Sequence, residues 1–157
     1  MKAYKQLVYG TQEYLNELKD ILNLDERFRE LSKGIYNATE LIIVKELNIG
    51  IWQQTLDGEI KELLLIPKSK LMDYEKQAEL KYYIDNYNNM VKICNGEDSF
   101  ISMVIDGSIE VNGNIKKLKR IQAPSERMEI IMRELCQSSL VLTKEQYIRW
   151  LSKNGYI

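Results

Sequence analysis

Hydrophobic residues near the N-terminus recur at the spacing of amphipathic helices. Between residues 11 and 24, five apolar side chains fall on one helical face, and Thr11 precedes them as an N-cap residue. Asp25 is placed to cap a second, shorter helix. That helix ends at Gly34, because glycine tolerates the left-handed conformation common at helix C-termini. The pattern therefore predicts two helices before the first strand.

After residue 35 the pattern becomes that of β-strands, rich in β-branched and aromatic side chains. Strands are expected over residues 36 to 46, 49 to 56, 59 to 66 and 78 to 84. Asp57-Gly58 is a strong two-residue hairpin sequence between the second and third of these. The stretch from residue 68 to 76 is polar, and we expect a linker there.

The second half of the chain returns mainly to helical spacing. The expected elements are a helix that Asp85 caps and Asn95-Gly96 ends, a short helix at 99 to 104, a strand at 108 to 112, a helix at 115 to 121, and two helices after Pro124. Thr143 and Gln146 form a capping box for the last helix. This order predicts an α+β fold: a five-stranded, largely antiparallel sheet with helices on one face, plus a C-terminal helical extension.

Composition excludes several kinds of chemistry. The chain has 157 residues, a net charge of −1 and no histidine, so we expect one domain without a Ser-His-Asp or Cys-His catalytic system. Two cysteines, Cys94 and Cys136, are too few for a zinc site, and we expect both to be reduced and buried. Four aspartates stand beside a glycine or a helix start and are interpreted as caps and turns: Asp57, Asp85, Asp98 and Asp106. No catalytic residue, metal or cofactor is predicted.

The hydrophobic runs are too short for a membrane span. The first ten residues lack a continuous apolar stretch of the signal-peptide kind, and the longest apolar runs have four residues. We therefore expect a cytoplasmic protein.

The order of elements between Ala78 and Ile121 has a distinctive glycine spacing. A strand leads into a helix ending at Asn95-Gly96, a short helix follows, and a strand with glycine at each end (107 to 113) precedes the amphipathic helix at 115 to 121. This arrangement resembles the C-terminal half of the sterol carrier protein (sterol transfer) domain family. The strand around Gly50-Ile51-Trp52 and its hairpin resemble the family's earlier strand pair.

The resemblance implies a carrier without covalent chemistry. Its sheet and helices would enclose an apolar tunnel for a lipid-like small molecule such as a fatty acid, acyl-CoA or other lipid. The candidate ligand-binding residues are Met90, Phe100, Met103, Val104, Ile109, Val111, Leu118 and Ile121. Ordinary core packing is the alternative for each of them.

Residues 122 to 157 extend beyond the carrier-like domain expected over residues 1 to 121, and we expect them to pack on it. Their apolar residues Met128, Ile131, Met132 and Leu135 form a candidate lid over the tunnel, a homodimer face, or additional core. The alternative function is therefore an interaction or dimerisation module with the same fold and a filled core.

A short basic cluster lies opposite the apolar side of the helix at 115 to 121. It consists of Lys116, Lys117, Lys119 and Arg120. Contact with an anionic membrane surface is one interpretation, and a solvated helix face is the other. Duplex binding usually needs a broader basic stripe, so no nucleic-acid partner is expected.

Overall fold

A five-stranded sheet forms the centre of the computed structural model, which describes residues 6 to 157. The strands are β1 (Ala38–Val44), β2 (Ile49–Leu56), β3 (Glu59–Ile66), β4 (Leu80–Ile84) and β5 (Ile109–Gly113), in the order β3-β2-β1-β4-β5. Neighbouring strands are antiparallel except β1 and β4, which are parallel. The predicted α+β fold is confirmed. Residues 1 to 5, part of the N-terminal stretch without a signal-peptide pattern, lie outside the described residues.

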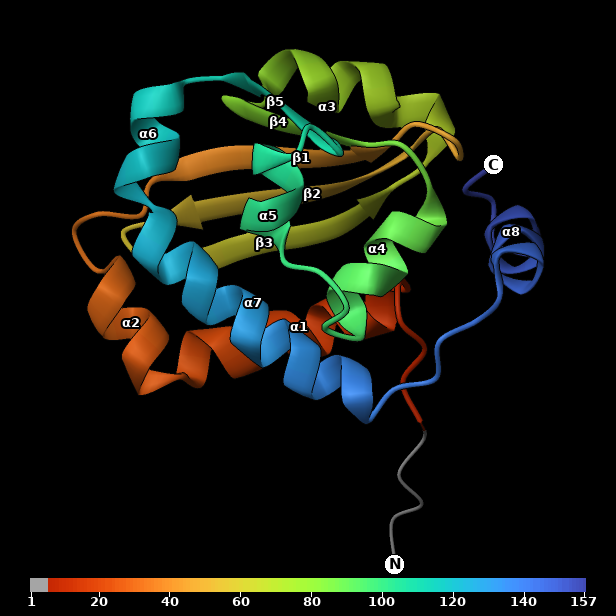
Figure 1. The fold of residues 1–157 in the computed structure, drawn as a ribbon, viewed down its shortest axis with the longest axis horizontal. Helices are drawn as coiled ribbons and strands as arrows, with labels where there is room; N and C mark the ends of the chain where they lie inside the picture. Colours follow the sequence, from red (N-terminus) through yellow and green to blue (C-terminus); the bar gives the residue numbers. More distant parts are fainter. Residues whose placement is uncertain (1–5) are drawn as a thin grey trace, which may run out of the picture.

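Most of the helices cover one face of the sheet (Figure 1). These helices are α1 (Gln12–Leu24), α2 (Glu26–Ser32), α4 (Tyr87–Cys94), α5 (Phe100–Ile105), α6 (Ile115–Arg120) and α7 (Gln122–Gln137). The last helix, α8 (Lys144–Lys153), lies at the side of the molecule and stacks Tyr147 on Tyr87 with ring centroids 4.6 Å apart. Within residues 6 to 157, no helix has the length and apolar character needed to cross a membrane.

Local sequence explains where most helices begin. The side chains of Thr11, Asp25 and Ser99 accept backbone N–H bonds at the starts of α1, α2 and α5, and the capping box of α8 is present. The predicted Asp85 cap is wrong, because the Asn86 side chain caps α4 instead. The carbonyl of Asp85 still accepts the N–H of Glu46, so the extended chain of β4 continues one residue further before the helix starts.

The predicted polar linker at residues 68 to 76 is wrong as well. The chain there forms a 3₁₀ turn, η1 (Lys68–Lys70), and the helix α3 (Leu71–Gln77), which lies on the opposite face of the sheet from the other helices (Figure 1). Tyr74 of α3 packs edge-on against Trp52, with ring centroids 5.1 Å apart. The segment folds because it covers a second hydrophobic cluster, made by Leu41, Ile43, Trp52, Ile66 and Ala78.

Cys94 of α4 and Cys136 of α7 form a disulfide, so the expectation of two reduced cysteines is wrong. Their Cα atoms are 5.6 Å apart, near the usual separation for a disulfide. The two residues are 42 positions apart, and nothing in the local sequence pairs them. Disulfides persist mainly in oxidising compartments. Reduced cysteines therefore no longer support the prediction of a cytoplasmic protein.

An ion pair joins α2 to α7. The guanidinium of Arg127 donates to both carboxylate oxygens of Asp25, from Nε at 3.0 Å and from Nη2 at 2.9 Å, while Phe28 donates its backbone N–H to the same carboxylate at 2.7 Å. The hydrogen bond from Arg127 lowers the pKa of Asp25 below its ordinary value, with a smaller contribution from Phe28.

This lowered pKa predicts a pH-dependent contribution to stability. A carboxyl group whose pKa is lower in the folded state stabilises the protein above its unfolded pKa of about 4, and that contribution is lost as the pH falls through the folded value. We expect Asp25→Asn to destabilise the protein by about 1 kcal/mol at pH 7, and by less at pH 3. Urea unfolding of both proteins at the two pH values measures this. An equal difference at pH 7 and pH 3 would contradict the assignment.

Candidate functional site

A cavity of about 270 Å³ lies between the sheet and the helices α4 to α7. Most of its lining is apolar and comes from both layers. The apolar wall consists of Ile42, Ile51, Ile84, Met90, Ile93, Phe100, Ile101, Val104, Leu118, Met128 and Met132. The lining is continuous across helices that are far apart in sequence, so the fold rather than any single motif creates the cavity.

The strand register arranges the floor of the cavity in rows. Glu40 of β1 pairs with Gln53 of β2, and two residues further along Ile42 pairs with Ile51 and with Tyr82 of β4. Because side chains alternate between the faces of a sheet, these residues point to the same side. One end of the floor is therefore polar, and the strands become apolar away from it.

Four of the predicted ligand-binding residues line the cavity: Met90, Phe100, Val104 and Leu118. The structure places the other four elsewhere. Met103, Ile109 and Ile121 are buried in the main core, and Val111 packs against that core. On the short helix α5, Phe100 and Val104 are four residues apart and share a face, whereas Met103 is fully buried in the main core. Ile109 and Val111 lie on the edge strand β5, where they pair with Ile84 and Tyr82, and neither side chain lines the cavity.

The predicted lid residues divide in the same way. Met128 and Met132 of α7 line the cavity, Ile131 is buried in the core, and Leu135 packs against the core without reaching the cavity. Figure 1 shows α7 running along the helical layer beside α1, and it also contacts α2, α4 and α6. The helix forms a wall of the cavity. Its role as a movable lid stays a prediction.

Sequence reasoning missed a group of polar side chains at one end of the cavity. This polar end consists of Tyr36, Glu40, Gln53 and Tyr82, all buried and all lining the cavity. Tyr82 donates its hydroxyl to Oε1 of Glu40 at 2.7 Å, and Tyr36 donates to Oε2 of the same carboxylate. Burial raises the pKa of Glu40, while the two tyrosine hydrogen bonds oppose that shift. One signal could have found the group: Glu40 lies in phase with Ala38 and Ile42, on one face of a strand whose apolar residues alternate onto both faces.

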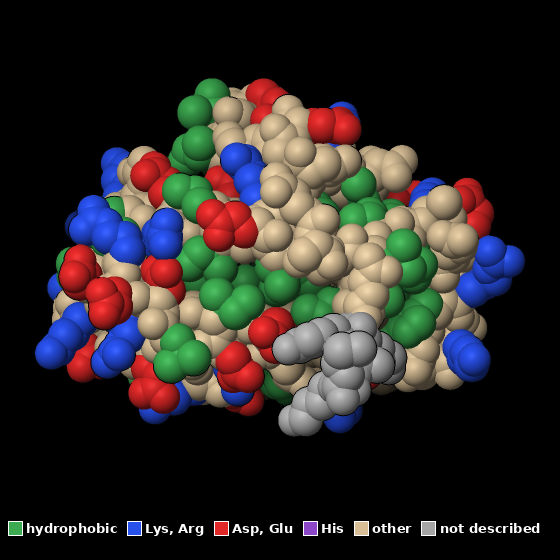
Figure 2. All heavy atoms as spheres, turned by 90° about the horizontal axis from the view of Figure 1, so that it is seen from below, with side chains coloured by type: hydrophobic (Ala, Val, Ile, Leu, Met, Phe, Trp, Pro, Cys, Tyr) green, Lys and Arg blue, Asp and Glu red, His purple; other side chains and the backbone are tan. Residues whose placement is uncertain are grey.

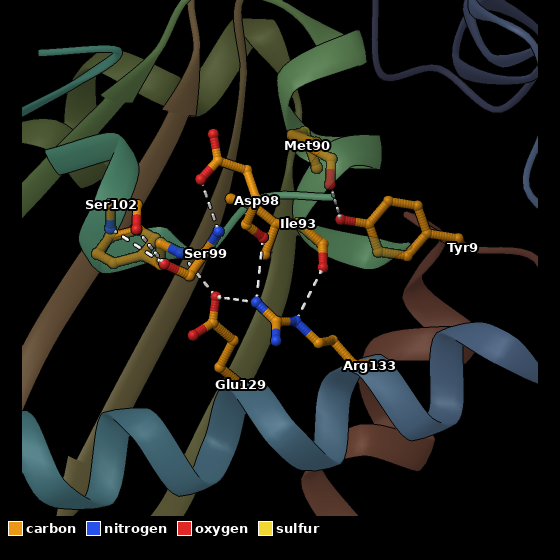
Figure 3. A network of polar contacts seen from close by, with 9 residues as sticks. Tyr9, Met90, Ile93, Asp98, Ser99, Ser102, Glu129 and Arg133 are labelled. Atoms are coloured by element: carbon orange, nitrogen blue, oxygen red, sulfur yellow. Dashed lines mark hydrogen bonds and ion pairs between the residues drawn. The ribbon is translucent and has the colours of Figure 1, made fainter. Parts of the chain in front are cut away.

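Arg133 and Glu129 of α7 hold the wall opposite the sheet in place (Figure 3). Arg133 donates to the backbone carbonyl of Asp98 at 3.0 Å and to Glu129 at 3.3 Å. Glu129 also accepts the N–H of Phe100 at 2.7 Å, at the start of α5. These contacts fix the loop between α4 and α5 to α7, and so position Phe100 over the cavity.

The basic cluster is spread over several environments. Lys117 pairs with Glu79, Lys119 lines the cavity near Glu126, and Lys116 and Arg120 are exposed. On the face seen from below Figure 1, hydrophobic side chains gather in a band across the middle, with charged side chains around it (Figure 2). Contact with an anionic membrane stays a prediction.

The four aspartates make short-range polar contacts. Asp57 accepts the N–H of Gly34, Asp98 that of Ser99 and Asp106 that of Ser108. Asp85 pairs with Lys45 at 3.3 Å on the surface. In the described part of the chain, no group of three acidic or cysteine side chains is arranged to hold a metal ion.

A search of solved structures relates this architecture to known proteins, whereas the sequence matches no protein-family model and no curated protein. Sterol carrier protein 2 superposes with a TM-score of 0.65 at 14% identity, over 79% of this chain and 96% of its own. The chain has the sterol carrier fold. TT1886 from Thermus thermophilus, a candidate sterol carrier protein, superposes with a TM-score of 0.66 at 14% identity, over 83% of this chain and 90% of its own. A ubiquinone synthesis protein, UbiJ-SCP2, gives a TM-score of 0.51 at 12% identity, over 76% and 91% of the two chains. The predicted resemblance is confirmed at the level of the sterol carrier fold.

Proposed function

We propose that the chain binds a lipid-like molecule in the cavity and carries it without making or breaking covalent bonds. The observation that carries this proposal is the cavity itself, lined mainly by apolar side chains from the sheet and from four helices. Removing an acyl chain or ring from water against such a wall contributes about 25 cal/mol per Å² before ordering costs. The sterol carrier fold supports the same conclusion, since sterol carrier protein 2 is among the structures that share it.

The cavity volume limits the size of the ligand. Pockets for small molecules usually have about 300–1,000 Å³, and a volume of about 270 Å³ falls just below that range. A single alkyl chain or a small ring system suits this space. The three methionine side chains that line the cavity, Met90, Met128 and Met132, can adapt to ligands of different shape.

The alternative, an interaction module with a filled core, is less well supported because the core contains this cavity. Dimerisation through the C-terminal helices stays a prediction. We also propose that residues 122 to 157 belong to the same domain as residues 1 to 121, since α7 contributes a wall of the cavity.

Filling the cavity tests the proposed function. Val104 lines the cavity from α5, so Val104→Trp places an indole where the ligand would lie. We expect this variant to bind a neutral hydrophobic fluorophore, N-phenyl-1-naphthylamine, at least about tenfold more weakly than the wild type, a change of about 1.4 kcal/mol. Fluorescence titration, with native mass spectrometry for co-purified lipid, measures the difference.

Ile105→Trp is the matched control. Ile105 is the next residue of the same helix, is 80% exposed and lies outside the cavity. It should leave the titration unchanged. Equal binding by Val104→Trp and the wild type, or no saturable binding by the wild type, would count against a ligand in this cavity.

A further inference from the structure

The hydrogen bonds that Tyr36 and Tyr82 donate at the polar end of the cavity both go to Glu40. Glu40 is 7% exposed, and each oxygen of its carboxylate accepts one tyrosine hydroxyl. Gln53 lies opposite Glu40 on β2 and donates its Nε2 group to Tyr36 at 3.1 Å and to Thr55 at 3.0 Å. The network therefore runs from Gln53 through Tyr36 to Glu40.

The donors and acceptors already used in this network determine which hydrogen bonds a ligand can still form. Each tyrosine hydroxyl has one proton and each has donated it to Glu40, and both N–H groups of Gln53 are in use. A carboxylate accepts about four hydrogen bonds, and Glu40 receives two from the residues described. No donor within residues 6 to 157 reaches the carbonyl oxygen of Gln53. The polar end can therefore accept further hydrogen bonds from a ligand, but it has few left to donate.

The charged residues near the polar end also favour a ligand that donates hydrogen bonds. Lys117 is the cation that acts on Glu40, and it is paired with Glu79. Arg133 is held by Glu129 and by backbone carbonyls at the opposite side of the cavity. Lys119 is exposed, and Glu126 lines the cavity with it. Both oxygens of Glu40 are hydrogen-bonded to tyrosine hydroxyls, so a ligand carboxylate placed against Glu40 would meet a buried carboxylate.

The apolar wall leads away from Glu40. Ile42, Ile51 and Tyr82 form the next row of the floor, and Ile84 lies in the row beyond. Phe100 packs edge-on against the Tyr82 ring, with centroids 5.1 Å apart, and closes the cavity from the helical side. Four strand residues from the Glu40 row to the Ile84 row span about 13 Å. A head group at Glu40 thus leaves an apolar floor of that length for a tail.

We propose that the cavity selects an amphiphile whose uncharged or cationic head group donates hydrogen bonds, an alcohol or an amine, and that Glu40 accepts them. This selectivity rests on the proposed function, because it assigns the orientation of a ligand in the same cavity. The Ser125 hydroxyl of α7 lies beside Tyr36 and can donate or accept there. Fatty acids are disfavoured, since their carboxylate offers only acceptors and would lie against the buried carboxylate of Glu40.

Three probes with one alkyl chain and different head groups test the selectivity: decanol, decylamine and decanoate. With the full-length protein at pH 7.5, competition against N-phenyl-1-naphthylamine should give decanol and decylamine affinities at least about tenfold above that of decanoate. Glu40→Gln removes the charge and keeps the shape. This variant should lower the ratio of the decylamine affinity to the decanoate affinity by about tenfold or more.

Glu134→Gln is the matched control, because it removes an exposed acidic charge of α7 that lies outside the cavity lining. It should preserve the wild-type order of affinities. If Glu40→Gln does not fold, Tyr82→Phe provides a second variant, which frees one oxygen of Glu40 and should strengthen decylamine binding. Tighter binding of decanoate than of decanol by the wild type, or an unchanged order in Glu40→Gln, overturns the selectivity while leaving a ligand in the cavity. Failure of all three probes to displace the fluorophore overturns the selectivity, and failure of the fluorophore itself to bind overturns the proposed function as well.

Discussion

Replacing Gly113 with alanine is expected to destabilise the protein by about 3–5 kcal/mol. Gly113 ends β5 with a φ of 118°, a conformation that L side chains rarely adopt. A Cβ atom there would lie 2.0 Å from the backbone carbonyl oxygen of Glu79, which also accepts the N–H of Asn114. Because the obstruction is backbone, β5 would have to move away from β4. Urea unfolding measures the free-energy difference.

Gly107→Ala separates the two causes of this effect. Gly107 also has a positive φ, 84°, but no atom lies within 4 Å of the Cβ position. Its replacement should therefore cost only the conformational part, about 1–2 kcal/mol. Equal losses of stability in the two variants would show that the close approach of Gly113 to β4 has no energetic consequence.

Gly113 also illustrates how far the fold could be predicted from the sequence. The spacing of glycines marked the end of the strand at Gly113, and hairpin and cap residues placed most other boundaries. These are local signals, and each acts within a few residues. The helix α3 lacked such a signal, because only Leu71 and Tyr74 reach the cluster around Trp52, and that cluster exists only after the sheet has formed. The parallel pairing of β1 with β4 is likewise a property of the assembled sheet.

The cavity could be predicted only in part, for a related reason. Helical spacing places Phe100 and Val104 on one face, but it does not say which faces meet across the helical layer. Glu40 was missed because a single acidic residue in a strand usually points to solvent. Its phase with Ala38 and Ile42 assigns it to the same face as these residues, yet its partner Tyr82 becomes a neighbour only through the pairing of β1 with β4.

Reduction of the disulfide between Cys94 and Cys136 is expected to lower the free energy of unfolding by about 2–4 kcal/mol. The bond closes a loop between positions 42 residues apart, and so restricts the unfolded chain. For a chain of this length the loss corresponds to a decrease in Tm of about 5–15 °C. Thermal unfolding followed by circular dichroism, with and without a phosphine reductant, measures it. The intact mass without reductant should be lower by two hydrogen atoms.

The same bond bears on the cavity, because α4 contributes Met90 and α7 contributes Met132 to its wall. Reduction leaves the hydrogen bond from Arg133 to the backbone of Asp98, so the two helices should remain associated at 25 °C while their packing loosens. We therefore expect weaker fluorophore binding without loss of the fold. The double variant Cys94→Ala/Cys136→Ala is the control. Its Tm and fluorophore binding should resemble those of the reduced wild type and should not change when the reductant is added. An oxidised protein whose Tm does not change on reduction would contradict the expected stabilisation, and a mass with both thiols intact would contradict the bond itself.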